Sequence, residues 1–475
     1  MDAEFQKAWE EYEAQRQKLV EANSNLLGVV LREKETRLDQ FLTELKKEYA
    51  ESCGGRIAYD IPVLTDAGLH ESRLYRFCSQ MPKGGDLHVH AMAMLPAREL
   101  IALLRECPEF CVNADRRSFD LVEADPQSPA PEGYLRVSEA LETGFYTEED
   151  LIVNWTVLGA QQAGMDVWSF FEQLFSRQRA LSKNMAFVEK YYDRAFRYYC
   201  RHNVQHVEIH MMMPDDMDRS VTYLETLRRV YYAVKKDYPA FTVKVIGAGV
   251  KADSEDMQKT KKCFLHTTCV QERVKDGSDP AEETDFVIGF DLVNEEDSSL
   301  PLRAFAPMLL QAKRQYPEMR FFIHGGESLD AGNENLIDAY LLGVCRVGHG
   351  LNLYRYPDLH RKYVDSEICL EVCPISNQAL GYTRDIRNHP ATEYLRTGVA
   401  VALCSDDPAY MENETLTDDF FAAVVGWNLS LADLKQLAIN SIVYSGLSSR
   451  GRTKALKDFG RLWDAFVDRM LEQGL

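Results

Sequence analysis

Eight short apolar runs, separated by segments with helical spacing, are the feature that most constrains the fold of this chain. The runs are rich in β-branched residues and cover 85–91, 204–211, 241–250, 286–293, 319–326, 344–349, 368–373 and 399–405. Helical spacing recurs between them, over 186–201, 220–235, 300–316 and 332–342. Eight strands that alternate with helices favour an α/β fold of the (β/α)8 TIM-type barrel over a doubly wound sheet.

Two segments do not fit this repeat. Residues 1–50 carry apolar side chains at helical spacing among charged ones, and the pattern breaks at Gly54-Gly55 and Pro62. We expect a helical extension over 1–75, which either lies on the barrel of residues 76–475 or packs against a partner subunit. The connection after the first strand is too long for one helix, and its part 107–135 is rich in Asp, Pro and Ser. This composition predicts an irregular insertion at about 105–150.

The composition excludes several functional classes. With a formal net charge of -20 over 475 residues, the chain lacks the basic surface that nucleic acid or an anionic membrane requires. No run approaches the length of a membrane span, and the N-terminus lacks the apolar core of a secretory signal. The 11 cysteines have no regular spacing, which indicates free thiols in a reducing compartment. We therefore expect a cytoplasmic protein.

Histidines and carboxylates follow four of the predicted strands at the same end. They lie in His88-Val89-His90, His324-Gly325-Gly326-Glu327, Val347-Gly348-His349 and Ser405-Asp406-Asp407. The loops after the strands of such a barrel converge on one face. Alternate residues of a strand share a face, so His88 and His90 are expected to project together. An ordinary surface or core pair of histidines would not explain why the other strands also end in polar residues.

These side chains supply the ligands of a single metal ion. Three imidazoles and a carboxylate suit Zn²⁺ or a similar first-row ion that keeps water in an open position. The predicted ligands are His88, His90, His324 and one of Asp406 or Asp407. An ion bound there lowers the pKa of water, so that hydroxide becomes available near neutral pH. We expect one Zn²⁺ or similar first-row ion per chain.

Two further residues fit proton-transfer roles beside the metal. His349 is flanked by glycines and is expected to orient the water or to take its proton. Glu327 follows a predicted ligand by three residues, so it is expected to enter the pocket without binding the ion. A carboxyl there suits a general acid that protonates a substrate nitrogen. The alternative for each is a buried ion pair, but the convergence of all these groups favours a functional site.

Two other metal chemistries fit the sequence poorly. Zinc sites of the cytidine-deaminase type need H-x-E and a later P-C-x-x-C. This chain has Cys373-Pro374 in the reverse order and no C-x-x-C pair. A two-metal hydrolase with a bridging modified lysine needs Lys at the end of the fourth strand, and residues 286–294 contain none. A single-metal site is therefore predicted.

Longer motifs extend this pattern along the chain. They include Met81-Pro82-Lys83-Gly84, Gly289-Phe290-Asp291-Leu292-Val293, Arg346-Val347-Gly348-His349-Gly350, Leu370-Glu371-Val372-Cys373-Pro374-Ile375-Ser376-Asn377-Gln378, Arg387-Asn388-His389-Pro390 and Ser405-Asp406-Asp407-Pro408. In this order they resemble the motifs of the adenosine deaminase family and, within it, of the adenosine deaminase-related growth factor subfamily. The resemblance covers most of residues 75–465.

The resemblance implies zinc-dependent hydrolytic deamination of an adenine nucleoside at C6, with release of ammonia. The matching zinc ligands are His88, His90, His324 and Asp406. By the same match, Glu327 would protonate purine N1, His349 would assist the attacking water, and Asp407 would bond the ring near N7. The N-terminal helices are similar to a segment that the subfamily uses for dimer contacts, which implies a homodimer.

The departures from the family pattern fall at the sugar end of the substrate. Ala91 stands where the subfamily has an Asp that contacts the sugar, and Asn294 stands where the family has a glycine facing purine N3. Trp168 matches a tryptophan that packs near the ribose, with simple core packing as the alternative. Gly326, beside Glu327, is also expected to contact substrate. A 5′-modified nucleoside such as methylthioadenosine is therefore an alternative substrate.

Two other functional hypotheses stay open at this point. A growth-factor-like relative could be a binding protein without catalytic activity, although the predicted ligands and acid are all present. The second hypothesis is a different single-metal hydrolase with the same barrel, which acts on an amide or amidine that is not a purine.

Overall fold

Eight parallel strands form the centre of the structure, a computed structural model that describes residues 3–23, 27–52, 70–115, 119–214, 216–251, 257–276 and 284–474. The strands are β1 (Gly84–His90), β5 (Val204–Met212), β6 (Thr242–Val250), β9 (Val287–Val293), β10 (Phe322–Gly325), β11 (Arg346–His349), β12 (Cys369–Val372) and β13 (Val401–Leu403). Each overlaps one of the runs predicted from the sequence.

The strands close into a barrel. They pair in parallel in two sheets of four, with the orders β1-β5-β6-β9 and β10-β11-β12-β13. Parallel bridges join the sheets at both seams, Phe290 with Phe321 and Val89 with Asp406. At the second seam the backbone N–H of His90 donates to the carbonyl of Asp406 (3.0 Å). The predicted (β/α)8 barrel is confirmed.

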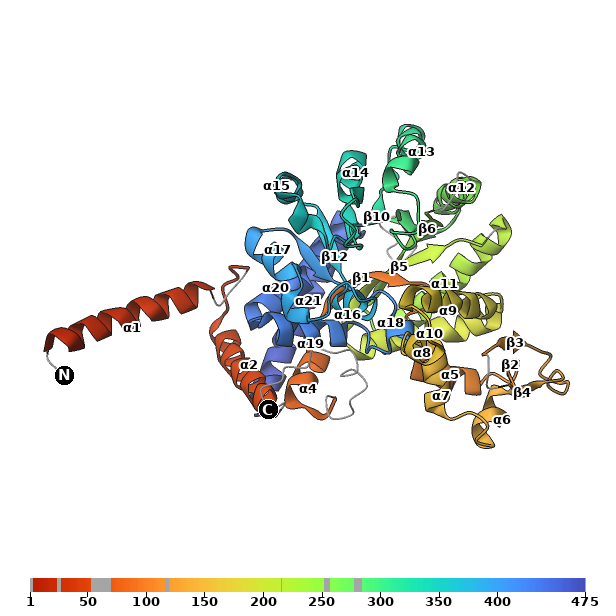
Figure 1. Cartoon of the computed structure of the whole chain (residues 1–475), viewed down its shortest axis with the longest axis horizontal. Coiled ribbons are helices and arrows are strands. Elements are labelled where there is room, and N and C mark those ends of the chain that lie inside the picture. The colour runs from red at the N-terminus through yellow and green to blue at the C-terminus, as the bar shows by residue number, and fades with distance from the viewer. Residues whose placement is uncertain are drawn as a thin grey trace.

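Helices surround this barrel (Figure 1). Those that connect successive strands are α11 (Met217–Asp237), α12 (Gln258–Arg273), α13 (Leu302–Gln315), α14 (Asn335–Leu342), α15 (Pro357–Asp365) and α17 (Ala391–Thr397). The helices predicted over 220–235, 300–316 and 332–342 are among them, and the one predicted over 186–201 is α10 (Met185–Arg201), which leads into β5. Asn184 begins α10, because its side chain accepts a hydrogen bond from the backbone N–H of Phe187 (2.9 Å).

The other elements are short pieces around the barrel and the helices after its last strand. They are α4 (Arg73–Gln80), β7 (Lys275–Asp276), β8 (Thr284–Asp285), η2 (Leu353–Arg355), α16 (Pro374–Ala379), η3 (Ile386–Asn388), α18 (Pro408–Met411), α19 (Leu416–Trp427), α20 (Leu431–Val443) and α21 (Ser449–Glu472). No helix within the described ranges has the length and hydropathy that crossing a membrane requires.

The long connection between β1 and β5 is more regular than its composition suggests. It contains α5 (Ala97–Arg105), β2 (Phe110–Asn113), β3 (Leu121–Glu123), β4 (Tyr134–Arg136), α6 (Val137–Glu142), α7 (Glu148–Trp155), α8 (Gly159–Ala163) and α9 (Val167–Leu181). The three strands pair antiparallel in the order β3-β2-β4. Most of 107–135 lies outside helices and strands, as expected, and the three strands were not predicted because strands of three or four residues are too short to show alternation in a sequence.

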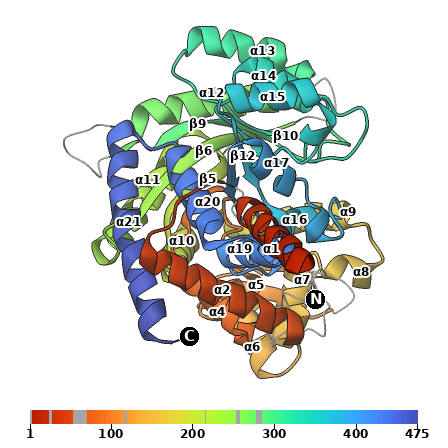
Figure 2. The ribbon, with the colours of Figure 1, turned by 90° about the vertical axis from the view of Figure 1, so that its left-hand side faces the viewer.

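The N-terminal extension contains one packed helix and one projecting helix. In α2 (Glu33–Ser52), the side chains of Leu38, Leu42 and Leu45 are buried in the main core. The first helix, α1 (Ala3–Asn23), extends away from the rest of the molecule (Figure 1), and residues 6–20 along it are exposed. Figure 2 shows α2 lying beside α4 and α21. The predicted break at Gly54-Gly55 and Pro62 lies outside the described residues.

Candidate metal and active site

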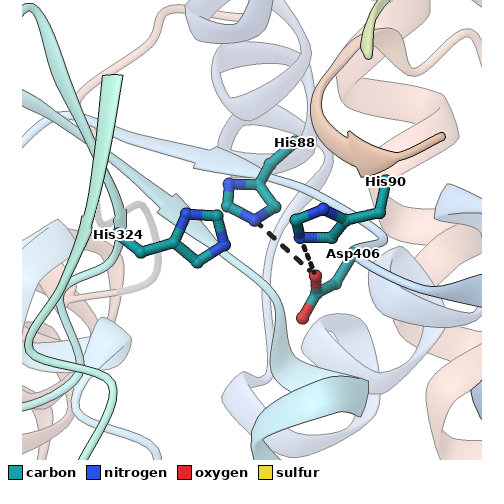
Figure 3. A group of neighbouring side chains, drawn as sticks. All are labelled: His88, His90, His324 and Asp406. Atoms are coloured by element: carbon teal, nitrogen blue, oxygen red, sulfur yellow. Dashed lines mark ion pairs between the residues drawn. The ribbon is translucent and has the colours of Figure 1, made fainter. Parts of the chain in front are cut away.

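Four side chains converge at the carboxyl end of the barrel (Figure 3). His88 and His90 come from β1, His324 from β10, and Asp406 from the segment directly after β13. One donor atom from each lies within 4.8 Å of the others. The Oδ1 atom of Asp406 is 3.2 Å from Nε2 of His90 and 3.6 Å from Nε2 of His88. The structure therefore brings together the predicted ligands, and Asp406 rather than Asp407 belongs to this set.

The seam of the barrel positions three of these four residues. The backbone N–H of Asp406 donates to the carbonyl of His88 (2.9 Å), and the N–H of His90 donates to the carbonyl of Asp406 (3.0 Å). Asp406 has a φ of +60°, a left-handed conformation that is uncommon for a residue with a side chain. Such strain concentrates at functional sites, where the surrounding structure holds it in place.

Buried carboxylates lie behind two predicted ligands. Glu371, on β12, lies 2.7 Å from Nδ1 of His88 and is itself held by Arg346 (2.5 Å). Asp291, on β9, lies 2.7 Å from Nδ1 of His324 and accepts a hydrogen bond from the backbone N–H of that residue (3.0 Å). A carboxylate behind a metal-binding imidazole fixes its tautomer and directs the other nitrogen to the ion.

The donor set fits a zinc ion. The Nε2 atom of His88 is fully buried and has no hydrogen-bond partner, which an ion at the centre of the cluster would supply. Burial opposes the ionisation of Asp406, but the neighbouring imidazoles of His88 and His90 lower its pKa well below the usual range. Three imidazoles and an ionised carboxylate are the ligands expected of a catalytic zinc site.

Glu327 and His349 face each other beside this cluster. The Oε1 atom of Glu327 is 3.6 Å from Nε2 of His349, and that Nε2 is 4.0 Å from Oδ2 of Asp406. Burial, reinforced by the charge of Asp406, raises the pKa of Glu327 well above its usual value, so this carboxyl holds a proton. Burial lowers the pKa of His349 to about 4, so its ring is neutral at neutral pH. The pair combines a proton donor with a proton acceptor.

The remaining predicted residues lie around the same face. Burial raises the pKa of Asp407 to about 8, and its Oδ1 atom has no hydrogen-bond partner. Gly326 has a φ of +68°, and a side chain there would clash with Leu336. Asn294 is exposed, and its amide donates to the carbonyl of Lys251 (3.3 Å).

Trp168 packs against the core and also makes a polar contact. It is half-buried on α9, and its indole N–H donates to the hydroxyl of Tyr382 (2.9 Å), in the loop after α16. Burial, together with the carboxyl of Glu327, raises the pKa of Tyr382. Trp168 and Tyr382 thus link the insertion to the loop that follows β12.

Sequence reasoning missed the residues that support the site, including Glu371, Asp291 and Tyr382. The two acids were visible as lone charges within apolar strand runs, a pattern that indicates a buried and paired carboxylate. Their partners depend on strand order and register, which no local pattern specifies. Nothing in the sequence near Tyr382 indicates its contact with Trp168.

Comparison with known proteins gives a consistent result. A family model described as adenosine deaminase matches residues 151–459. An adenosine deaminase from Aedes albopictus is 32% identical over 503 residues, covering 97% of this chain and 89% of that protein. Adenosine deaminase 2-A from Danio rerio is 29% identical and covers 92% of this chain and 90% of that protein.

Solved structures with the same fold are more distant in sequence. The N6-mAMP deaminase of Arabidopsis superposes with a TM-score of 0.58 at 15% identity, covering 81% of this chain and 99% of that one. An amidohydrolase from Burkholderia ambifaria with bound Zn superposes with a TM-score of 0.59 at 16% identity, covering 84% and 95%. At these identities the likeness concerns the fold alone.

Proposed function

The chain belongs to the adenosine deaminase family, and from this premise we propose that it removes the C6 amino group of adenosine or a related adenine nucleoside by hydrolysis. Water adds at C6, ammonia leaves, and the product is the inosine-type nucleoside. The observation that carries the proposal is the convergence of a four-donor cluster with the buried carboxyl of Glu327 and the buried imidazole of His349, which lie 3.6 Å apart.

The metal is proposed to be one Zn²⁺ per chain. The residues that would hold it are His88, His90, His324 and Asp406. When bound, the ion would supply a Lewis acid that lowers the pKa of the attacking water. Metal analysis of the purified protein tests the identity and the number of ions, because iron and cobalt share these ligands.

Three side chains are proposed to handle the substrate ring and the protons. Glu327 donates its proton to ring N1, so that the ring can accept the attack at C6. His349 accepts a proton from the attacking water at Nε2, the nitrogen that faces Glu327 and Asp406. Asp407, whose Oδ1 is buried without a partner, contacts the ring near N7.

The test is turnover of a panel of substrates. Purified, zinc-loaded protein is incubated with adenosine, 2′-deoxyadenosine, methylthioadenosine and adenine while ammonia release is followed. We expect turnover of at least one nucleoside. Glu327→Gln should lower kcat by about 10² to 10⁴ with the metal retained, since a general acid contributes that much. Loaded protein that turns over none of these compounds would instead favour a binding protein or another hydrolase.

A second candidate substrate is a nucleoside with an apolar 5′ substituent. At the position after His90 this chain has the methyl group of Ala91, which is half-buried and packs against the core. An apolar side chain there would favour a methylthio group over a hydroxyl. Ala91→Asp should then shift the ratio of kcat/KM for adenosine over methylthioadenosine upward, and an unchanged ratio would exclude this role for Ala91.

The surface of α1 supports a homodimer. Trp9, Tyr12 and Leu19 are 49%, 55% and 65% exposed, and the rings of Trp9 and Tyr12 stack on each other, so that apolar surface is exposed together, as at many protein contact sites. A second copy of the chain is the proposed cover, through contacts between the N-terminal helices.

A reducing, cytoplasmic location is also proposed. All ten cysteines within the described ranges are free thiols, and several of them are buried. Fractionation of cells that make the native protein tests this location. Recovery of the chain in the culture medium would contradict it.

A further inference from the structure

A buried carboxylate holds the loop that carries Glu327. Glu296 lies in the segment after β9 and is 7% exposed. It accepts hydrogen bonds from the backbone N–H groups of Gly326 (3.1 Å), Glu327 (2.9 Å) and Ser328 (3.2 Å), and from the side-chain amides of Asn333 (2.5 Å) and Asn335 (2.7 Å). Three successive backbone donors thus point at one carboxylate, an arrangement that fixes the path of the chain through those residues.

A buried cation completes this arrangement. Lys251 follows β6 directly and is fully buried. Its Nζ atom is 3.3 Å from Oε1 of Glu296 and donates to the carbonyl of His324 (3.0 Å). The ion pair therefore spans the short segment that joins the predicted metal ligand His324 to Glu327.

The backbone between these two residues does not fix its own conformation. Gly325 and Gly326 separate His324 from Glu327, and Gly326 has a φ of +68°. A glycine pair allows many conformations, so an external contact has to select one. The carboxylate of Glu296 makes that contact, because it bonds to Gly326 and Glu327 at the same time.

We propose that Glu296, paired with Lys251, is a positioning residue that places the carboxyl of Glu327 for proton donation to the substrate. Glu296 acts through the loop and does not touch the substrate or the metal. The inference rests on the proposed function, since it assigns Glu327 the role of proton donor.

The test begins with Glu296→Gln. The amide keeps the size of the side chain, but it loses the charge that Lys251 faces and presents an NH₂ group to a backbone donor. We expect kcat to fall by about 10², the loss typical of a catalytic group displaced by about 1 Å. KM should stay within about threefold of the wild-type value, and the metal content should not change.

The matched control is Asp418→Asn. Asp418 is a buried carboxylate on α19 that accepts a hydrogen bond from the hydroxyl of Tyr75 (2.7 Å) outside the site. This variant should keep wild-type kcat.

A double variant separates positioning from a general loss of structure. Adding Glu296→Gln to Glu327→Gln should cause no further loss of kcat, because the effect of Glu296 passes through Glu327. Glu296→Asp, which keeps the charge, should restore part of the activity and serves in place of the glutamine variant if that one does not fold.

Three results would overturn the inference. They are wild-type kcat in Glu296→Gln, an additive loss in the double variant, and loss of the metal in parallel with kcat. Each result is compared with the turnover of the wild-type protein. If the wild-type protein shows no nucleoside deaminase activity, the proposed function fails. If it is active and one of the three results is found, only this inference fails.

Discussion

The contact between Glu371 and His88 is the most consequential single-residue contact outside the ligands themselves. Both side chains are fully buried, and Arg346 holds Glu371 from behind while also contacting Glu208 (2.5 Å). A network of this kind orients the imidazole before the metal arrives. Losing the carboxylate leaves His88 free to take the wrong tautomer.

We therefore predict that Glu371→Gln weakens metal binding by about 10- to 100-fold, the effect typical of residues behind a metal ligand. Competition against a chelator of known affinity measures the change, and Asp418→Asn again serves as the buried control. Unaltered metal affinity would show that the His88 ring is fixed by packing alone.

Tyr382 provides a second test at this scale. Its hydroxyl accepts the indole N–H of Trp168, so Tyr382→Phe removes one hydrogen bond and leaves the ring in place. We expect KM for adenosine to rise by about 2- to 10-fold, as expected for a bond of about 0.5–1.5 kcal/mol, with little change in kcat. Tyr354→Phe, at an exposed tyrosine that is 47% accessible, is the control. An unchanged KM would mean that Trp168 and Tyr382 lie outside the bound substrate.

At the scale of elements, one buried acid links α2 to the helices that follow the last strand of the barrel, in addition to the apolar side chains that α2 buries. Glu35 is fully buried and is bonded by Arg32 (3.0 Å), Lys435 (2.6 Å) and the indole of Trp463 (2.8 Å). These partners lie on α20 and α21 or precede α2, so Glu35 ties the N-terminal extension to the end of the chain.

Glu35→Gln is predicted to destabilise the fold by about 2–4 kcal/mol, because it breaks a buried ionic contact. Denaturant unfolding measures the change. Glu48 lies on α2, like Glu35, but it is exposed and pairs with Arg73 of α4. Glu48→Gln should therefore change the free energy of unfolding by less than about 1 kcal/mol. Equal stabilities of the two variants would contradict the role of Glu35.

The same contact has a defined pH dependence. Burial opposes ionisation, but the bonds from Arg32 and Lys435 lower the pKa of Glu35 to about 2, below its ordinary 4.5. The folded state therefore binds fewer protons than the unfolded state between these values, and the stabilisation is lost as pH falls from about 4.5 to about 2. The stability difference between wild type and Glu35→Gln should be full above pH 4.5 and should shrink below it.

Elements were predictable where their pattern is long and local. The runs 204–211 and 241–250 became β5 and β6 almost unchanged, since β-branched stretches bounded by turns define a strand without reference to its neighbours. The metal-site residues could be predicted because the strand ends of a barrel converge. The role of Glu296 could not be predicted, because its partners lie about 30 residues further along the chain and meet it only after the loops pack.

At the scale of the whole molecule, the metal site lies on the seam that closes the barrel. His88 and His90 come from the first strand and Asp406 from the end of the last, and one ion would bind both sides of that seam. Ligands that bind only the folded state raise its stability. Removal of the metal with a chelator is thus predicted to lower the unfolding temperature, and re-addition of zinc should restore it. A zinc-independent unfolding temperature would contradict this coupling.

The last prediction concerns assembly and follows from the different positions of the first two helices. Deleting residues 1–26 removes α1 and its exposed aromatic side chains but leaves α2, whose Leu38, Leu42 and Leu45 belong to the core. We expect the full chain to be a dimer and the shortened chain to be a folded, active monomer, because the barrel and its site do not include α1. Light scattering coupled to size-exclusion chromatography measures both masses.

The matched control is the full chain with Trp9→Ser and Tyr12→Ser. It keeps the helix and removes the aromatic pair, whose ring centroids lie 5.4 Å apart. A shortened chain that remains a dimer would place the subunit contact on another surface, whereas loss of folding would mean that α1 supports the barrel after all.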